Sequence, residues 1–327
     1  MKRVVLPVLV VVLALVAAVG CGRSGGAAAR PPEIRLDYAY YSPLSLVIKH
    51  HGWMEEEFQA DGLPVKWVLS LGSNKAIEYL ASESADFTST AGAAALLARS
   101  NGIPLQVVYI YSKPEWTALV TRKDSPIRTV ADLKGKKVAA TKGTDPYIFL
   151  LRALDTAGLS QSDIELVHLQ HPDGKAALDR GEVDAWAGLD PHMAQANLES
   201  GARLFFRNPD FNTYGFLNVR QSYADRYPEI VKRVLKVYER ARRWALEHPE
   251  ETARILAEQA KMSPEVARQV LTRNDFRNPI PGEEHRRGLA AASRILVKEG
   301  LIKPGVDPEK VIGELIRPEF ARAVVQP

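Results

Sequence analysis

The chain has 327 residues, which is enough for more than one folded unit, since a single hydrophobic core rarely grows beyond about 250–300 residues. Hydrophobic residues make up 46% and charged residues 25%, and these globular values exclude a disordered chain. The 43 Lys and Arg residues exceed the 39 Asp and Glu residues only slightly and are scattered along the chain, so no nucleic-acid partner is predicted.

The N-terminal segment has the pattern of a secretory signal. A basic pair precedes an apolar run over 4–19, which is shorter than the roughly 20 residues of a membrane span. The single cysteine, Cys21, follows a small-residue stretch, as in a lipoprotein signal that makes this cysteine the lipidated first residue; the alternative is a chance cysteine in a cleaved leader. We expect a signal peptide over 1–20, a flexible tether over 21–32, and an exported, lipid-anchored protein on the periplasmic or extracellular face of the cell membrane.

From Glu33 onward, short apolar runs alternate with helical stretches, which is the pattern of an α/β fold. Strands are predicted over 34–41, 65–71, 86–89, 105–111, 117–121, 137–140, 165–169, 185–188 and 213–219. Beyond these strands helices dominate, and the longest is expected over 228–249.

Two short linkers, near 113–117 and 212–216, would let the chain cross twice between two lobes. The predicted domains are therefore lobe 1 over 33–115 plus 217–327 and lobe 2 over 116–216. Each lobe is expected to be an α/β sandwich.

Many strands are followed by a polar or glycine-containing turn that starts a helix. These turns are Ser42-Pro43, Gly72-Ser73-Asn74, Thr90-Ala91-Gly92, Gly143-Thr144-Asp145-Pro146 and Asp190-Pro191. In an open parallel sheet such turns gather at one edge, where helix N–H groups suit an anionic ligand. The alternative is that each polar residue only caps its own helix.

The sequence resembles the periplasmic binding proteins for aliphatic sulfonates, taurine and nitrate, an NMT1/THI5-like family that also includes binders of thiamine precursors. The resemblance spans the mature chain and is carried by Tyr41-Ser42-Pro43-Leu44, Gly72-Ser73-Asn74, Ala85-Asp86-Phe87, residues 129–139, Lys142-Gly143-Thr144, residues 181–186 and Asp190-Pro191. It implies a type II periplasmic binding fold that closes on a small organic anion and delivers it to the permease subunits of an ABC importer. It also implies a monomer without cofactor or enzymatic activity.

The resemblance also implies a set of ligand-binding positions. They are Tyr41, Ser42, Ser73, Thr90, Ala91, Trp116, Gly143, Thr144, Asp145, Trp186, Asp190 and Tyr214. In a sulfonate-binding protein, N–H groups around Ser73, Ala91 and Thr144 would hold the oxyanion. Trp186 and Tyr214 would cover the organic tail.

Asp145 departs from the family pattern, because relatives carry a small neutral residue there. Its carboxylate would either turn outward and cap its helix or pair with an amine of the ligand, which would favour a taurine-like zwitterion or a basic heterocycle. A thiamine-pyrimidine or riboflavin-like ring, stacked between aromatic side chains of the cleft, is the alternative ligand.

Histidines suggest a metal site only weakly. His168 and His171 are three residues apart, but the pattern there predicts a strand and then a loop, with Pro172 next, and no second cysteine could join them. The sequence G-x-S-x-G occurs only at residues 22–26, in the predicted tether rather than at a strand-to-helix turn, so no nucleophile elbow is predicted, and the chain has no P-loop motif. No metal and no catalytic residue are predicted, and an enzyme on the same fold remains the minor alternative.

Overall fold

A computed structural model describes residues 30–325 of the chain. Cys21, the predicted signal peptide and most of the predicted tether lie outside these residues. A compact unit that begins at Pro31 holds two separate β-sheets flanked by helices. The predicted α/β fold with two sheets is confirmed.

The first sheet has six strands in the order β11-β4-β10-β3-β1-β2. They are β1 (Ile34–Tyr38), β2 (Val65–Leu69), β3 (Phe87–Ala91), β4 (Leu105–Pro114), β10 (Gly215–Arg220) and β11 (Asn274–Asp275). Strand β1 runs parallel to β2 and β3, whereas β10 lies antiparallel between β3 and β4. We call this sheet and the helices that pack on it the first lobe.

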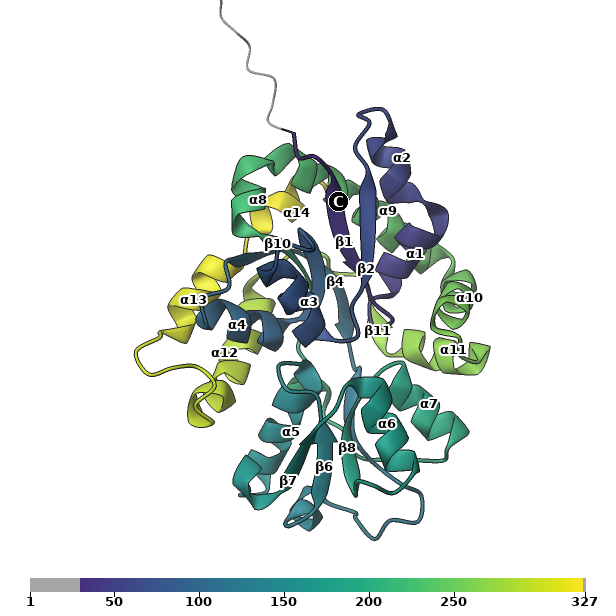
Figure 1. Cartoon of the computed structure of the whole chain (residues 1–327), viewed down its shortest axis with the longest axis vertical. Helices are drawn as coiled ribbons and strands as arrows, with labels where there is room; N and C mark the ends of the chain where they lie inside the picture. Colours follow the sequence, from purple (N-terminus) through teal and green to yellow (C-terminus); the bar gives the residue numbers. More distant parts are fainter. Residues whose placement is uncertain (1–29, 326–327) are drawn as a thin grey trace, which may run out of the picture. The chain divides into compact units, whose positions relative to one another are not determined.

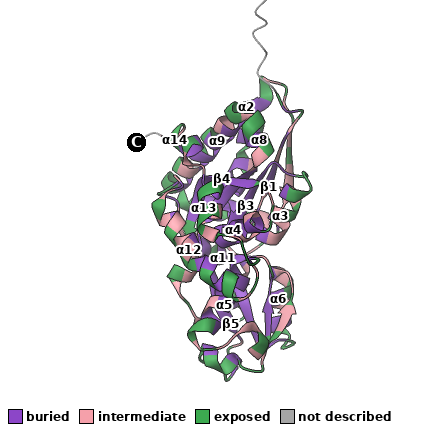
Figure 2. Ribbon diagram, turned by 90° about the vertical axis from the view of Figure 1, so that its left-hand side faces the viewer, coloured by how far each residue is buried: buried purple, intermediate pink, exposed green. Residues whose placement is uncertain are grey.

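Helices cover both faces of the first sheet. They are α1 (Pro43–His51), α2 (Trp53–Gln59), α3 (Ser73–Ala81), α4 (Gly92–Ser100), α8 (Gln221–Arg226), α9 (Pro228–Glu247), α10 (Pro249–Ala260), α11 (Pro264–Thr272), α12 (Glu283–Lys298), α13 (Pro308–Leu315) and α14 (Pro318–Arg322). One apolar cluster joins the sheet to α1, α9, α10 and α11, and another joins it to α4, α12 and α13 (Figure 1). Figure 2 shows the strands as the buried layer between these helices.

The second sheet has five strands in the order β7-β6-β8-β5-β9, and with its helices it forms the second lobe. The strands are β5 (Thr117–Thr121), β6 (Lys137–Ala140), β7 (Glu165–His168), β8 (Ala185–Leu189) and β9 (Arg203–Phe206). The helices are α5 (Asp145–Thr156), α6 (His171–Asp179) and α7 (His192–Glu199), with short 3-10 helices over Val130–Leu133, Gln161–Asp163 and Pro209–Phe211.

The chain crosses between the sheets twice, after β4 and after β9. The first crossing joins Pro114 to Thr117, and the second joins Phe206 to Gly215. The lobes also pack on each other, because α5 of the second lobe contacts α4 and α12 of the first. Parallel strands β6, β7 and β8 all end toward the start of β5, so the helices that follow them begin near the crossings.

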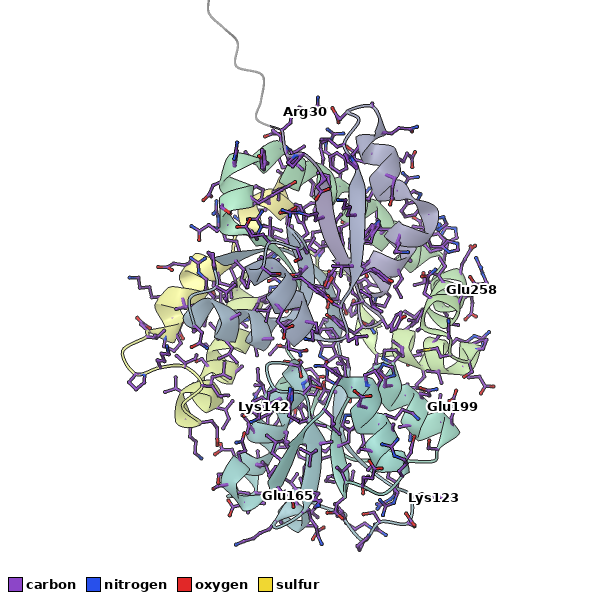
Figure 3. The ribbon with its side chains drawn as sticks, viewed as in Figure 1. Arg30, Lys123, Lys142, Glu165, Glu199 and Glu258 are labelled. Atoms are coloured by element: carbon purple, nitrogen blue, oxygen red, sulfur yellow. The ribbon has the colours of Figure 1, made fainter. Side chains whose placement is uncertain are left out.

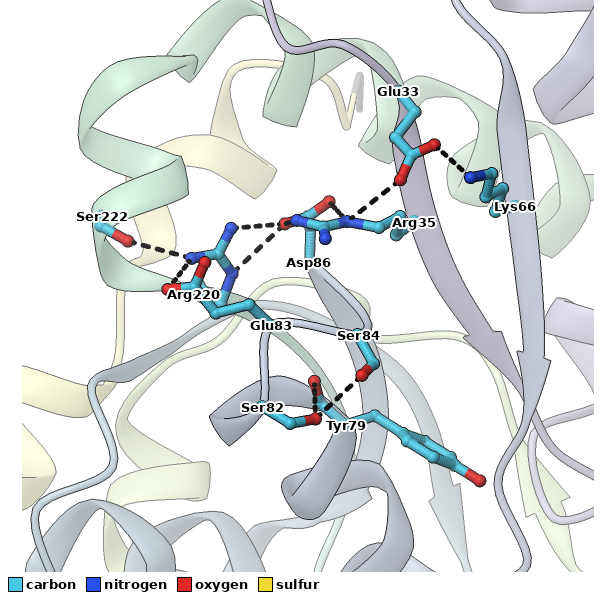
Figure 4. Close-up of polar contacts among 10 residues, drawn as sticks. All are labelled: Glu33, Arg35, Lys66, Tyr79, Ser82, Glu83, Ser84, Asp86, Arg220 and Ser222. Atoms are coloured by element: carbon cyan, nitrogen blue, oxygen red, sulfur yellow. Dashed lines mark hydrogen bonds and ion pairs between the residues drawn. The ribbon is translucent and has the colours of Figure 1, made fainter.

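A buried carboxylate ties three strands together at the end of the first sheet away from these helix starts. Asp86, which is fully buried, accepts two hydrogen bonds of 2.9 Å from Arg35 and two, of 2.6 and 3.2 Å, from Arg220 (Figure 4). Glu33 and Glu83 extend the network by ion pairs with Lys66 and Arg220. The Asp86 that helps to define the family resemblance therefore holds the sheet together.

The sequence pattern missed some elements. Gly52, at φ +66°, ends α1, and α2, which the sequence pattern did not predict, starts directly afterwards. The loop predicted before Pro172 covers only Leu169 and Gln170, because α6 starts at His171 and Pro172 lies in its first turn, where its missing N–H costs nothing. Among residues 30–325, no helix is long and apolar enough to cross a membrane.

Candidate functional site

The helices α3 and α5 begin without a capping side chain. Gly72 and Thr144 occupy their N-cap positions, and neither provides a side-chain bond to the first turn. Ser263 and Asp307 cap α11 and α13 through their side chains, but other helices, such as α9 and α10, also begin without a capping side chain. The first N–H groups of α3 and α5 have no acceptor within their own helices and are therefore available to a ligand.

These two helix starts come from different lobes and meet. A Cβ placed on Gly143 would lie 3.5 Å from Cβ of Asn74, and one placed on Gly72 would lie 3.1 Å from Nε2 of His171. Gly143 has φ +79°, which favours glycine, and follows Lys142, labelled in Figure 3. Two positive helix ends that face each other across lobes form an arrangement suited to an anion.

The start of α4 is already occupied by the protein itself. The N–H of Ala91 donates to Oγ of Ser73 at 3.0 Å, and the N–H of Gly92 donates to the carbonyl of Tyr214 at 2.9 Å. The hydroxyl of Thr90 accepts a 2.8 Å bond from Asn218. The N–H of Ala91, expected to hold an oxyanion, is therefore committed to the fold.

Strands β1 and β3 separate close to α1. They pair only at Leu36 and Phe87, beyond which Oδ1 of Asp37 accepts the N–H of Ser89 at 2.8 Å. The hydroxyl of Ser89 lies 3.4 Å from that of Ser42, which makes no capping bond to α1. Since α1 and α4 leave the sheet on opposite faces, this gap is a topological switch point, the usual crevice for ligands in open α/β sheets.

Asp37 is fully buried, and its Oδ2 has no hydrogen-bond partner within residues 30–325. Burial raises the pKa of this carboxyl to about 7. The folded protein therefore binds more protons than the unfolded chain between about pH 4 and pH 7, and the contribution of Asp37 to stability falls as the pH rises through this window.

We expect Asp37→Asn to be more stable than the wild type at pH 8, by at most about 4 kcal/mol, because it removes a buried charge and keeps the acceptor for Ser89. The difference in unfolding free energy, measured by denaturant titration from pH 4 to pH 8, should grow up to about pH 7 and then level off. Buried histidines titrate in both proteins, so their contributions to the two unfolding free energies cancel in this difference. A difference that does not change with pH would show that Asp37 titrates normally.

Asp145 links both crossings to α5. Its Oδ2 accepts from Nε1 of Trp116 at 2.8 Å and from the N–H of Thr213 at 2.9 Å, and its Oδ1 accepts from the Thr213 hydroxyl at 2.6 Å. The outward orientation considered from the sequence is wrong, because Asp145 is only 1% exposed. Burial raises the pKa of this carboxyl. Since three donors already occupy its oxygens, Asp145 acts as a structural link rather than as a partner for a ligand amine.

Tyr41 and Trp116 pack together in the core near the first crossing. Their rings meet edge to face at 6.0 Å, and the Tyr41 hydroxyl donates to the carbonyl of Ser89 at 2.9 Å. Both side chains are buried and hydrogen-bonded. They shape the wall of the switch point but do not form two parallel faces for a ring.

Asp190 also connects the lobes. It follows β8, accepts the N–H of Ala194 at 2.9 Å, and pairs with Arg273, which follows α11 of the first lobe, at 3.0 Å. The two side chains are 1% and 7% exposed. Burial raises the pKa of Asp190 to about 6 although Arg273 opposes the shift. The structure therefore places Asp190 in an ion pair between lobes rather than facing a ligand.

Trp186 lies in the core of the second lobe. It is fully buried in an apolar cluster with Ala118, Ala139 and Leu178. A Cβ on Gly174 of α6 would lie 2.6 Å from its Nε1, so the indole fills the space that this glycine leaves. The structure does not bring Trp186 together with the starts of α3 and α5.

Tyr214 faces a different space. Its hydroxyl donates to Glu284 at 3.1 Å, its ring packs on His285 at 4.3 Å, and it lines a cavity of about 820 Å³ beside the crossings. The helix starts α3 and α5 contribute no residue to this cavity. The expectation that Trp186 and Tyr214 jointly cover a ligand tail therefore has no support from their positions.

His171 is a residue of this region that the sequence pattern did not suggest as a ligand contact. It is fully buried at the start of α6, and its Nε2 points toward Gly72 of the first lobe. The signal that could have found it is Pro172, since proline marks the first turn of a helix. In the described part of the chain, no three His, Cys, Asp or Glu side chains are grouped so that they could hold a metal ion.

Comparison with known proteins shows which family the chain is similar to. The NMT1/THI5-like family model matches residues 45–252. An aliphatic sulfonates-binding protein of Bacillus subtilis (strain 168) is 30% identical over 281 residues, which cover 85% of this chain and 84% of the relative.

Two solved structures share the fold. The alkanesulfonate-binding protein SsuA from Xanthomonas axonopodis pv. citri, bound to MOPS, has a TM-score of 0.80 and 25% identity over 89% of this chain and 99% of its own. The periplasmic aliphatic sulphonate binding protein SsuA from Escherichia coli has a TM-score of 0.74 and 28% identity over 88% and 92%.

Proposed function

We propose, because this chain belongs to the NMT1/THI5-like family, that it is the extracytoplasmic substrate-binding component of an ABC importer and captures a small organic sulfonate. One observation carries the proposal. The uncapped starts of α3 and α5 face each other from different lobes, with Asn74 against Gly143. Because similar proteins are named as sulfonate-binding proteins, we infer that the anion held between the helix starts is a sulfonate.

Binding would work as clamp closure. A sulfonate oxygen that accepts N–H groups from α3 contacts only the first lobe, and one that accepts from α5 contacts only the second lobe. Both sets of bonds form only when the lobes are closed, so the ligand shifts the population toward the closed state. The hydroxyls of Ser42 and Ser73 would complete the site on the first lobe, and Gly143 and Thr144 would complete it on the second.

The remaining parts of the proposal concern partners and location. Cys21 would carry a lipid that holds the exported protein at the outer face of the membrane. The protein would be a monomer, and permease subunits would recognise its closed form. The protein would return its ligand unchanged. A chromatographic assay that recovers every sulfonate intact after incubation would support a binder, whereas a new product would identify an enzyme.

Ligand class can be tested by thermal stability after bound ligand has been stripped by unfolding and refolding. The panel would contain alkanesulfonates, taurine, nitrate, bicarbonate, a thiamine pyrimidine and riboflavin. A ligand at 100 times its Kd adds about 2.7 kcal/mol, which should raise the melting temperature by several degrees. We expect this increase with sulfonates. An increase with only a ring compound would make the heterocycle the ligand and the sulfonate proposal wrong.

A further inference from the structure

Two buried polar atoms from different lobes lie around the same glycine. A Cβ on Gly72 would be 2.8 Å from Oδ1 of Asn74 in the first lobe and 3.1 Å from Nε2 of His171 in the second. Neither atom has a hydrogen-bond partner among residues 30–325, and His171 is fully buried. Since buried polar atoms in folded proteins are nearly always hydrogen-bonded, their partner is expected to arrive with the ligand.

The hydrogen bonds of Thr141 fix which nitrogen of His171 carries the proton. The Thr141 hydroxyl donates its single hydrogen to the carbonyl of Leu169 at 2.6 Å, and its oxygen lies 3.2 Å from Nδ1 of His171. That oxygen can therefore only accept, so Nδ1 must be the protonated donor. Nε2 of the neutral ring then carries a lone pair. Burial lowers the pKa of His171 to about 3, which keeps the ring neutral at physiological pH.

We propose that Nε2 of His171 and Oδ1 of Asn74 form an acceptor pair for an N–H or O–H group on the organic part of the ligand. This inference rests on the proposed function and narrows its substrate class. The N–H groups of α3 and α5 would hold the sulfonate, and the acceptor pair would select sulfonates with an ammonium or hydroxyl group a few bonds away. An alkanesulfonate without such a donor would leave both acceptors unpaired when the lobes close.

Calorimetric titration of the purified protein at pH 7.5 with matched ligands tests the selection. The ligands are 2-aminoethanesulfonate, 2-hydroxyethanesulfonate and propane-1-sulfonate, which differ chiefly in whether an amine, a hydroxyl or a methyl group ends the chain. We expect the two donor-bearing sulfonates to bind at least tenfold more tightly than propane-1-sulfonate. Equal affinities for the three would overturn the acceptor pair but leave the sulfonate clamp. Absence of binding by all three would overturn the proposed function and the acceptor pair with it.

Two variants separate a ligand contact from a structural role. In His171→Phe the ring shape stays, and Thr141 keeps its bond to Leu169; Asn74→Leu removes the other acceptor. Each should narrow the ratio of 2-aminoethanesulfonate to propane-1-sulfonate affinity at least fivefold, while the affinity for propane-1-sulfonate changes less than threefold. His248→Phe, at an exposed position between α9 and α10 of the first lobe, is the control and should leave the ratio unchanged. If both sulfonates weaken equally in Asn74→Leu, the acceptor pair is wrong, even if His171→Phe does not fold.

Discussion

Replacing Asp145 by alanine should lower the unfolding free energy by about 3–5 kcal/mol, one of the two largest effects expected in this protein. The change leaves Nε1 of Trp116 and both the N–H and the hydroxyl of Thr213 without their acceptor in a buried place. Each unpaired buried donor costs about 1–3 kcal/mol, and loss of the unfavourable buried charge offsets part of the sum. Denaturant titration followed by tryptophan fluorescence would measure the loss.

The Asp145 network also connects the two lobes. The Thr213 hydroxyl that donates to Asp145 accepts the N–H of Ala93 at 3.0 Å, so α5 of the second lobe is connected to α4 of the first. Asp155→Ala is a matched control on the same helix, because Asp155 is 46% exposed and pairs with Lys298 on the surface. It should change stability by less than about 1 kcal/mol. Equal losses of unfolding free energy in the two variants would show that the Asp145 network stabilises the protein no more than a surface ion pair does.

Replacing Arg273 by alanine should cost a similar amount, about 3–5 kcal/mol, because it leaves the carboxylate of Asp190 buried and without its cationic partner. The pKa of Asp190, already raised to about 6 by burial, would rise further. The variant should therefore lose more stability above pH 6 than below it, since a protonated Asp190 needs no partner. Unfolding titrations at pH 5 and pH 8 would measure the difference.

A double variant shows whether the ion pair accounts for this loss. Arg273→Met combined with Asp190→Asn removes both charges, and its cost should be well below that of Arg273→Ala alone. Arg207→Ala is the surface control, because Arg207 is 51% exposed and pairs with Glu115 at 2.8 Å; it should cost less than about 1 kcal/mol. An Arg273→Ala variant as stable as Arg207→Ala would contradict the role of the pair in joining the lobes.

Much of the architecture could be predicted from the sequence because it depends on local patterns. The strand predicted over 117–121 coincides with β5, and the long helix predicted to start at 228 is α9. Proline and glycine signals located the starts of α1 and α5 correctly, since they act within one helical turn. Local signals of this kind also carried the family resemblance.

The site could be predicted only in part, because side-chain partners come from distant segments. Asp145 accepts a hydrogen bond from Thr213, which is 68 positions away in the sequence. Because this contact holds the carboxylate in the interior, Asp145 has no role at the surface. Trp186 has the size of a ligand-covering residue, but the space beside Gly174 holds it in the core. His171 was set aside as a metal ligand, and its position opposite Gly72 depends on how the lobes meet. The positions Ser73, Gly143 and Thr144 remain proposed ligand contacts.

The central claim is that a sulfonate is held by N–H groups from two helices in different lobes. Amide chemical shifts of the isotopically labelled protein, recorded with and without 2-aminoethanesulfonate, test it residue by residue. We predict that the largest changes occur together at the starts of α3 and α5, including Ser73, Asn74 and Thr144. Changes confined to one lobe, or to the cavity beside Tyr214, would contradict the clamp.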